Sequence, residues 1–269
     1  MKRVSTMAPP PEAGSFRARL LARETLVGTF VKTTSHQTVE VLGGASLDFV
    51  VLDAEHAPFS RDALDLALLA AKAVNLPALV RVPAARDELI GNALDLGAAG
   101  VIAPHVRNAA EAAALARASR YRGGTRGFST SPRAGRYGLT GMADMIVAGD
   151  RQSVTLAMIE DEAALACIDD IVASDVDGLF IGRADLALSC GMNTLDDPLL
   201  AQHVETICAA ATRAGKPVAM FVGGENEVAR HAASGVTAFV VGSDQSLLRA
   251  GAFAMRGAVL EAAARPVRQ

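Results

Sequence analysis

Two carboxylates and an imidazole stand close together in the stretch Asp53-Ala54-Glu55-His56-Ala57-Pro58. Carboxylates can act as acids, bases or metal ligands, and an imidazole can move a proton near neutral pH. The apolar run 47–52 before them is typical of a buried parallel strand, and Ser60 after them is a suitable N-cap for a helix. The pattern predicts a strand-to-helix loop that carries reactive groups. A capping Asp, a surface Glu and a structural His are the alternative interpretation.

Short apolar runs alternate with helical sequence along the whole chain. The expected strands are 26–31, 47–52, 77–82, 100–103, 154–159, 178–181, 217–222 and 238–241. The expected helices are 38–42, 63–74, 87–96, a segment capped by Asn108, 161–171, a segment ending at 214, 225–234 and 245–263, and 121–141 is expected to be a loop.

This alternation predicts an α/β fold with a parallel sheet, and eight strand-helix units predict a TIM (β/α)8 barrel. An open doubly wound sheet is the competing fold. It favours a Gly-x-Gly-x-x-Gly turn after the first strand, which this sequence does not have. We expect a flexible N-terminal tail over residues 1–13 and a single barrel domain over residues 14–269.

Polar residues stand where the predicted strands end, and in a TIM barrel those ends form the face that carries the active site. They are Asp53, Glu55 and His56, then Arg81, His105, Glu160, Arg183 and Asp185. Glu160 and Asp185 are hard oxygen donors that suit Mg²⁺ or Mn²⁺ together with water. Arg81 offers a planar fork to a substrate carboxylate. Helix caps and a structural salt bridge are the alternatives for these residues.

The placement of lysine bears on the mechanism, because a Schiff-base aldolase needs a lysine inside the barrel. The chain has Lys2 in the tail, Lys72 in a helix and Lys216 before a strand, on the opposite face. Lys32 follows the first strand and stays open as a Schiff-base residue, although we expect it to face solvent. The pattern favours an enolate stabilised by a metal ion.

The composition fits a protein with a large aliphatic core. Hydrophobic residues make up 51% of the chain and aromatic residues 4%, and tryptophan is absent. A net charge of −3 and a pI near 6.0 predict neither nucleic acid nor a membrane surface as a partner. No apolar segment of the kind a secretory signal needs stands before residue 13, and no apolar run reaches the ~18 residues of a membrane helix, so we expect neither. Widely spaced Cys167, Cys190 and Cys208 predict reduced thiols and a cytoplasmic location.

Several motifs resemble those of the HpcH/HpaI aldolase family. The stretch 53–58 is similar to its D-x-E-H-x-P signature. The other similar stretches, in matching order, are Leu79-Val80-Arg81, Ala93-Leu94-Asp95-Leu96-Gly97, Arg126-Gly127-Phe128, Met158-Ile159-Glu160, Phe180-Ile181-Gly182-Arg183-Ala184-Asp185-Leu186 and Gly242-Ser243-Asp244. The resemblance covers about residues 28–248. It implies a class II pyruvate aldolase on a TIM barrel, such as 4-hydroxy-2-oxoheptanedioate aldolase or 2-dehydro-3-deoxyglucarate aldolase.

The resemblance also implies a reaction, a metal and a role for each site residue. The reaction is reversible retro-aldol cleavage of a 4-hydroxy-2-oxo acid to pyruvate and an aldehyde, through a pyruvate enolate on Mg²⁺, Mn²⁺ or Co²⁺. The implied residues are Glu160 and Asp185 for the metal, Arg81 for the enolate, His56 with Asp53 and Asp95 of the partner subunit for proton transfer, and the backbone near Ala184 for the pyruvate carboxylate. The family is usually hexameric, a trimer of dimers with a helix exchanged between paired subunits, so we expect a homo-oligomer.

Two positions depart from the family pattern. Met158 stands where Gln is common and would lose a hydrogen bond to the substrate. Arg183 stands where Pro is common. We expect Arg183 to be a mobile cation at the mouth of the pocket, which either binds an anionic tail of the acceptor aldehyde or bends into solvent.

Two other functions stay open. One is an acyl-CoA lyase of the citrate-lyase β type, which is related in fold and metal use but lacks the D-x-E-H-x-P stretch. The other is a non-catalytic barrel that binds a small acid, since a fold does not prove a function. The combination of His56, Arg81, Glu160 and Asp185 counts against a non-catalytic protein.

Overall fold

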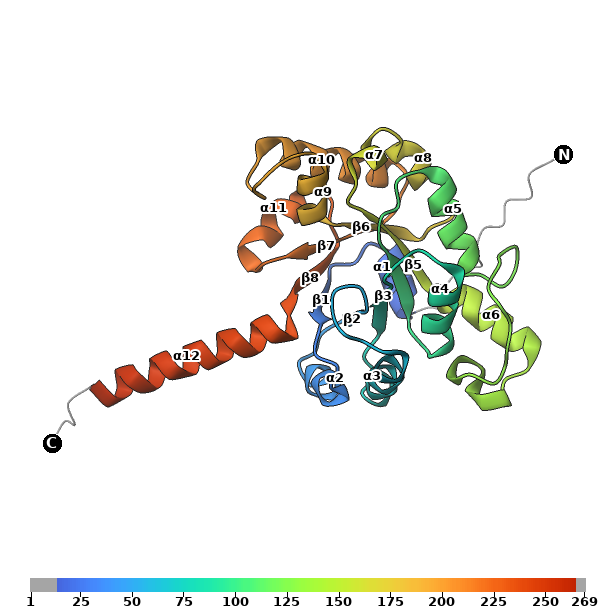
Figure 1. The fold of residues 1–269 in the computed structure, drawn as a ribbon, viewed down its shortest axis with the longest axis horizontal. Helices are drawn as coiled ribbons and strands as arrows, with labels where there is room; N and C mark the ends of the chain where they lie inside the picture. Colours follow the sequence, from blue (N-terminus) through green and yellow to red (C-terminus); the bar gives the residue numbers. More distant parts are fainter. Residues whose placement is uncertain (1–13, 265–269) are drawn as a thin grey trace.

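The computed structural model describes residues 14–264, and its centre is a closed barrel of parallel strands (Figure 1). The strands are β1 (Leu26–Val31), β2 (Phe49–Asp53), β3 (Ala78–Arg81), β4 (Gly100–Ala103), β5 (Val154–Ile159), β6 (Gly178–Ile181), β7 (Val218–Val222) and β8 (Ala238–Ser243). Each pairs in parallel with the next, and β8 pairs with β1 to close the ring. The predicted TIM barrel is confirmed. The predicted tail, residues 1–13, lies outside the described residues.

Helices follow the strands and surround the barrel. They are α1 (Phe16–Leu21), α2 (His36–Gly43), α3 (Arg61–Ala73), α4 (Asp87–Asp95), α5 (Ala109–Ala118), α6 (Met142–Gln152), α7 (Glu162–Leu165), α8 (Ile168–Val172), α9 (Arg183–Ser189), α10 (Pro198–Arg213), α11 (Val228–Ala233) and α12 (Asp244–Ala264). Two short 3₁₀ helices, η1 (Arg133–Gly138) and η2 (Glu225–Glu227), lie in loops. Both predicted N-caps are confirmed: Ser60 accepts from the Ala63 amide, and Asn108 accepts from the Glu111 amide.

Some helices differ from the sequence-based expectation. The segment 161–171 was expected to form one helix, but it forms α7 and α8, because Cys167 adopts non-helical dihedral angles between them. Helices α1 and α6 were not predicted. The N-cap of α6 is Gly141, which makes no side-chain capping bond, so the usual signal of a helix start is missing.

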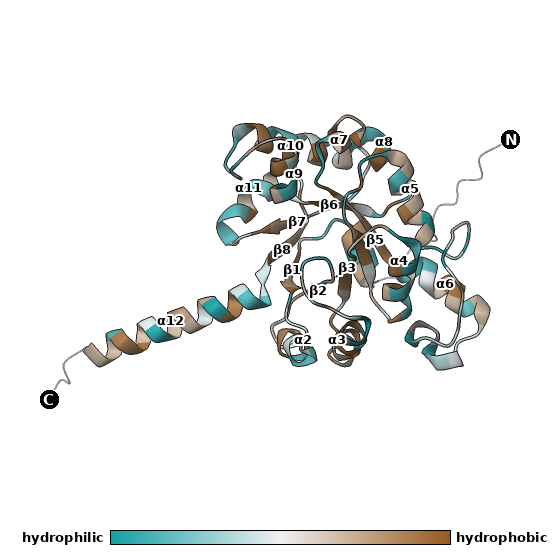
Figure 2. Cartoon of the chain, in the orientation of Figure 1, coloured by the Kyte–Doolittle hydropathy of each residue, from teal (hydrophilic) through white to brown (hydrophobic). Residues whose placement is uncertain are grey.

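Side chains alternate along each strand and build two cores. Residues such as Phe49, Leu79 and Phe180 point into the barrel, while their neighbours pack outward against the helices. The strands are accordingly the most hydrophobic part of the ribbon (Figure 2). At the carboxyl ends of three strands the next inward position is polar. Asp53 stands two residues after Val51, Arg81 two after Leu79 and Glu160 two after Met158. The alternation thus brings these three groups to one rim.

Helix α12 is different from the others, because it extends away from the barrel (Figure 1). Only its first residue, Asp244, is buried. Large apolar side chains along it are exposed: Leu247, Leu248, Phe253, Met255, Val259 and Leu260. Within residues 14–264, no helix combines the length and the apolar character needed to cross a membrane.

A buried ion-pair network at the amino-terminal ends of the strands connects the barrel to α1 and to the segment after α5. The carboxylate of Asp177, just before β6, accepts hydrogen bonds from the guanidinium groups of Arg17 and Arg120 at 2.6–3.2 Å. It also accepts the Thr155 amide at 2.8 Å. All three charged side chains are at most 8% exposed. Removing one partner of such a network leaves buried charges uncompensated.

We predict that Asp177→Ala lowers the free energy of unfolding by about 3–5 kcal/mol, because two buried guanidinium groups lose their counter-ion. Asp169→Ala is the matched control. It removes one surface ion pair with Arg213, whose side chains are more than half exposed, and should cost about 0–1 kcal/mol. Denaturant unfolding of both variants measures the difference. Equal costs would contradict the assigned role of Asp177.

Candidate active site

The rim of the barrel is organised by a buried ion pair between Asp53 and Arg81. The register places these residues side by side at the ends of β2 and β3. Arg81 donates to both carboxylate oxygens of Asp53, from Nε at 3.0 Å and from Nη2 at 2.8 Å. Its guanidinium also lies 4.6 Å from the centre of the Phe30 ring. Within the described residues Nη1 makes no hydrogen bond, so one end of the fork stays available to a ligand.

This pair keeps Asp53 ionised. Burial by itself would raise the pKa of Asp53, but the hydrogen bonds and charge of Arg81 outweigh it and hold the pKa below its ordinary value. The backbone amide of His56 also donates to Asp53, at 3.1 Å. The described contact between the two residues is through the His56 backbone, and the expected orientation of the His56 imidazole by Asp53 stays a prediction.

The imidazole of His56 faces Glu55 instead. Its Nε2 lies 3.7 Å from Glu55 Oε2, and the side chain is about half exposed. The same carboxylate oxygen of Glu55 lies 3.4 Å from Nε of Arg81 and is buried without a hydrogen bond. Burial raises the pKa of Glu55 despite the nearby charge of Arg81. The Glu55 carboxylate, which can accept a proton, and the exposed His56 imidazole thus lie together at the carboxyl-terminal end of the barrel.

Glu160 and Asp185 form the second part of the rim: Glu160 directly follows β5, and Asp185 lies in the first turn of α9, after β6. Glu160 is buried, and burial raises its pKa to about 7, with the charges of Glu55 and Asp185 adding to the effect. The amide of His105 opposes this shift by donating to Oε1 at 2.8 Å. A buried carboxylate beside another carboxylate is unfavourable unless a cation joins them.

This donor set fits a divalent ion. No group of three or more His, Cys, Asp or Glu side chains arranged to hold a metal is found in residues 14–264. Mg²⁺ and Mn²⁺ need no such group, because they are commonly held by one or two carboxylates and keep several waters. Gly182 leaves room for the Glu160 carboxylate: a Cβ there would lie 2.6 Å from Oε2 and 2.7 Å from the Met158 methyl group.

His105 is a site residue whose role the sequence did not indicate. Its backbone has a φ of +56°, which is uncommon outside glycine. In this conformation the His105 amide donates a hydrogen bond to Glu160. Its Nδ1 lies 3.1 Å from Asp161 and 3.4 Å from Glu160. Burial would lower the pKa of His105, but the hydrogen bond to Asp161 and the charge of Glu160 raise it. The residue was visible as polar at a strand end, and its left-handed backbone had no signal in the sequence.

Lys32 does not face solvent as expected. It follows β1, and its Nζ lies 3.3 Å from Asp53 Oδ2 and 5.7 Å from the centre of the Phe30 ring. Its side chain is 31% exposed. The structure therefore adds a second cation to the rim, beside Arg81.

Arg183 is not the mobile cation that was expected. Its guanidinium forms an ion pair with Glu227 and donates to the Phe221 carbonyl at 3.3 Å. Nη1 lies 3.2 Å from Nε2 of buried His231. The side chain is only 9% exposed. Its charge is compensated by a residue that the sequence separates from it by more than forty positions.

The remaining expected site residues lie in different places. Met158 is buried in the barrel interior beneath Glu160, where its methyl group borders Gly182. Ala184 is exposed in the first turn of α9. Asp95 ends α4, and its carboxylate accepts from Nη2 of Arg126 at 3.1 Å. The role expected for Asp95 concerns the partner subunit and stays a prediction.

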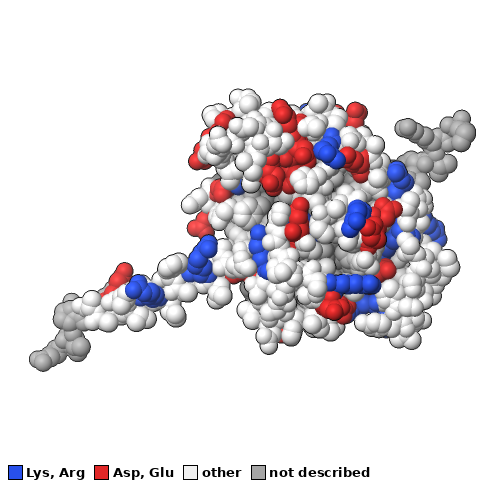
Figure 3. Space-filling view, in the orientation of Figure 1, with Lys and Arg blue, Asp and Glu red and all other residues white. Residues whose placement is uncertain are grey.

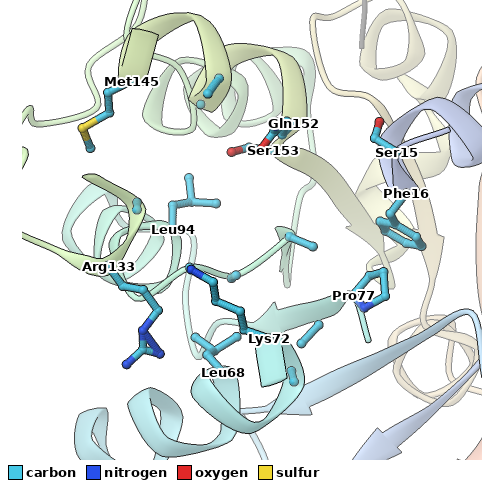
Figure 4. A pocket seen from close by; sticks show the side chains of 18 of the residues that line it. Ser15, Phe16, Leu68, Lys72, Pro77, Leu94, Arg133, Met145, Gln152 and Ser153 are labelled. Atoms are coloured by element: carbon cyan, nitrogen blue, oxygen red, sulfur yellow. The ribbon is translucent and has the colours of Figure 1, made fainter. Parts of the chain in front are cut away.

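One cavity lies away from this rim. A cavity of about 480 Å³ is lined by Pro77, Ala78, Ala98 and Ala99, at the amino-terminal ends of β3 and β4, and by Lys72 and Arg133 (Figure 4). It therefore lies at the opposite end of the barrel from Glu160. On the surface shown in Figure 3, acidic side chains gather in the upper half, with basic side chains among them.

The matching of this chain to known proteins identifies its family. The model of the HpcH/HpaI aldolase/citrate lyase family matches residues 26–250. The chain belongs to this family. A 5-keto-4-deoxy-D-glucarate aldolase of Salmonella arizonae is 34% identical over 239 residues, which is 88% of this chain and 93% of that protein.

Solved structures of other proteins have the same fold. A family protein from Burkholderia cenocepacia J2315 superposes with a TM-score of 0.84 at 30% identity, over 90% of this chain and 98% of that one. The citrate synthase SbnG superposes with a TM-score of 0.83 at 27% identity, over 93% and 99% of the two chains.

The space at Gly182 gives a test of Glu160 as a candidate metal ligand in this HpcH/HpaI protein. Gly182→Ala should weaken Mn²⁺ binding about 10–100-fold, because the added methyl group displaces the Glu160 carboxylate. Gly91→Ala, in α4 with no heavy atom within 4 Å of its new Cβ, is the control and should bind Mn²⁺ as the wild type does. Titration calorimetry measures both. Unchanged affinity in Gly182→Ala would contradict the idea that the space at Gly182 positions Glu160 for the ion.

Proposed function

We propose that this protein is a class II aldolase that cleaves a 4-hydroxy-2-oxo acid to pyruvate and an aldehyde, and catalyses the reverse addition. The observation that carries the proposal is that negatively and positively charged side chains meet at the same end of the barrel. Buried Glu160 follows β5 and Asp185 follows β6, and Arg81, held in place by Asp53, ends β3. The 34% identical relative is itself named an aldolase of a keto-deoxy sugar acid.

Glu160 and Asp185 would hold the divalent ion, with Mg²⁺, Mn²⁺ and Co²⁺ as the candidates. When bound, such an ion supplies Lewis-acid stabilisation of the enolate of pyruvate. The protein's own contribution is a rigid carboxylate: the His105 amide fixes Oε1 of Glu160, and Gly182 leaves its other oxygen uncrowded. The backbone near Ala184 would receive the pyruvate carboxylate.

Arg81 would bind the keto oxygen of pyruvate and stabilise the negative charge that develops there. Its fork is already oriented by two hydrogen bonds to Asp53 and by stacking on Phe30, so it needs little reorganisation during the reaction. The free Nη1 is the donor that we assign to the substrate.

His56 would move the proton between the aldol hydroxyl and solvent. Its imidazole is exposed, 3.7 Å from Glu55. Its backbone is fixed by the hydrogen bond that the His56 amide donates to Asp53. An exposed imidazole can exchange protons with water and with a ligand in the same pocket, which suits a general acid–base. Asp95 of the partner subunit would complete this group in the assembly.

The assembly that we propose is a homohexamer built from dimers that exchange α12. This helix leaves the barrel, exposes a row of large apolar side chains and would be costly to keep in water. Its first turns also line a groove of about 710 Å³ with Val41 and Leu42 of α2. Sedimentation should give the mass of six chains.

The three cysteines are unpaired, in keeping with a cytoplasmic location.

The first experiment tests the reaction and the metal together. Chelator should abolish pyruvate release from a 4-hydroxy-2-oxo acid, and Mn²⁺ or Mg²⁺ should restore it, because the enolate loses its main stabilisation without a divalent ion. Borohydride with pyruvate should leave the protein unmodified by mass spectrometry. Activity that survives chelator, or a pyruvate adduct on Lys32, would contradict the class II assignment.

A pair of variants separates the two proposed roles. Arg81→Ala should lower turnover about 10²–10³-fold and slow the exchange of pyruvate methyl protons, because it removes charge stabilisation of the enolate. His56→Ala should lower turnover of the full aldol reaction about 10²–10⁴-fold, as expected for loss of an acid–base group. Circular dichroism controls for folding. Wild-type turnover in both folded variants would mean that the site lies elsewhere.

A further inference from the structure

The cavity of about 480 Å³ at the amino-terminal end of the barrel is a feature that the proposed mechanism does not use. Cavities that bind small molecules typically measure about 300–1,000 Å³, so this one is large enough for a ligand. Residues of α3, α4, α6 and η1 line it. Arg81 and Glu160 lie at the other end of the strands. A ligand in this cavity would therefore not contact the proposed catalytic groups.

The wall of the cavity carries positive charge without a negative counterpart. Its charged residues are Lys72, Arg126, Arg133 and Arg136, and within the described residues no Asp or Glu lines it. The chain as a whole is different, because it has 29 acidic residues and 26 basic ones. Charges of one sign gathered in a partly enclosed space attract ligands of the opposite sign. The wall therefore favours an anion.

Two of these cations are compensated from outside the cavity, and two are not. Arg126 and Arg133 each donate to an aspartate that does not line the cavity, at 3.1 and 2.6 Å. The ammonium of Lys72 and the guanidinium of Arg136 belong to exposed residues and have no ion-pair or hydrogen-bond partner in the part of the chain that the structure describes. Two uncompensated positive charges match a ligand with two negative charges.

Two residues of the wall also contain a buried polar atom without a partner. Nε of Arg126 and the hydroxyl group of Tyr121 make no hydrogen bond within residues 14–264. The two side chains are stacked, with the guanidinium 4.3 Å from the centre of the Tyr121 ring. Nearly all buried polar groups in native proteins are hydrogen-bonded. These two atoms therefore need a partner that the described wall does not provide.

Charged and apolar side chains occupy different sides of the cavity. Figure 4 shows Lys72 and Arg133 on one side, and Phe16 and Pro77 on the other. The charged side is held in place, because Arg133 of η1 donates to the carbonyl and the carboxylate of Asp65 at 3.2 and 2.6 Å. Asp65 belongs to α3, the helix that also carries Lys72. A ligand with an anionic head and an apolar ring fits this division.

We propose that this cavity is a second ligand site, which binds a small molecule with two negative charges and an apolar ring. The anionic head is a phosphate monoester or a pair of carboxylates, since both offer several oxygen acceptors to lysine and arginine. Lys72 and Arg136 supply the charge, and Phe16 with Pro77 borders the ring. The site is independent of the proposed aldolase reaction, because none of these residues has a role in it.

The first measurement is a calorimetric titration of the full-length protein, in the assembly that it forms, with phenyl phosphate and with phthalate. Both probes carry a ring and two negative charges, and they differ in the head group. At least one of them should bind tenfold or more tightly than inorganic phosphate, which lacks the ring, and than phenol, which lacks the charge. The tighter probe identifies the head group. Binding of both probes no tighter than that of phenol would overturn the inference.

Substitutions then locate the bound probe. Lys72→Gln and Arg136→Gln should each weaken binding of the tighter probe about tenfold, because each removes a charged donor. Lys72→Arg should keep most of the affinity. Arg213→Gln is the matched control for net charge: it removes an exposed cation that does not line the cavity, and it should bind the probe as the wild type does. Circular dichroism controls for folding.

A further control separates this cavity from the rim. Arg81→Ala should bind the probe with wild-type affinity, because Arg81 ends β3 and the cavity lies where β3 begins. Unchanged affinity in both Lys72→Gln and Arg136→Gln would overturn the inference. Loss of binding in Arg81→Ala would also overturn it, because the probe would then occupy the candidate active site.

Discussion

The site depends on one buried ion pair, between Asp53 and Arg81. Burying two charges is costly and is offset only when the geometry is good and the remaining polar atoms are bonded. Here the pair is bidentate, the His56 amide gives Asp53 another donor, and the Phe30 ring covers the guanidinium. The pair joins the ends of β2 and β3 and leaves one amino group of Arg81 free. Arg81 is therefore oriented before any substrate arrives.

The carboxylates of the rim differ because their partners differ. Asp53 has a guanidinium against it, so its pKa lies below the ordinary value. Glu160 has one backbone amide and other carboxylates near it, so burial raises its pKa to about 7. Environments that push the pKa values of two acids apart are typical of sites where the acids have different roles. One carboxylate positions a cation of the protein, and the other lacks a cation, which a bound metal ion would supply.

Much of the fold follows from local patterns. The apolar runs predicted all eight strands to within a few residues, because inward and outward faces are both buried in a parallel barrel and the sequence is continuously hydrophobic there. Ser60 and Asn108 marked helix starts correctly, since capping is a contact between residues three apart. Of the helices that were missed or divided, α6, α7 and α8 begin without a side-chain capping hydrogen bond, while α1 is capped by Ser15 but is only six residues long.

The sequence alone determined which strand ends carry Asp53, Arg81, Glu160 and Asp185, because period-two alternation and strand length decide what points inward at the rim. Only the tertiary structure decided the partners of the flexible cations. Lys32 reaches Asp53 across the β1–β2 pair, while Arg183 turns to Glu227 beyond β7. Long side chains have many rotamers, and the charges that select one rotamer come from strands and loops distant in sequence. Closure of the barrel brings those charges together, and no local pattern contains that information.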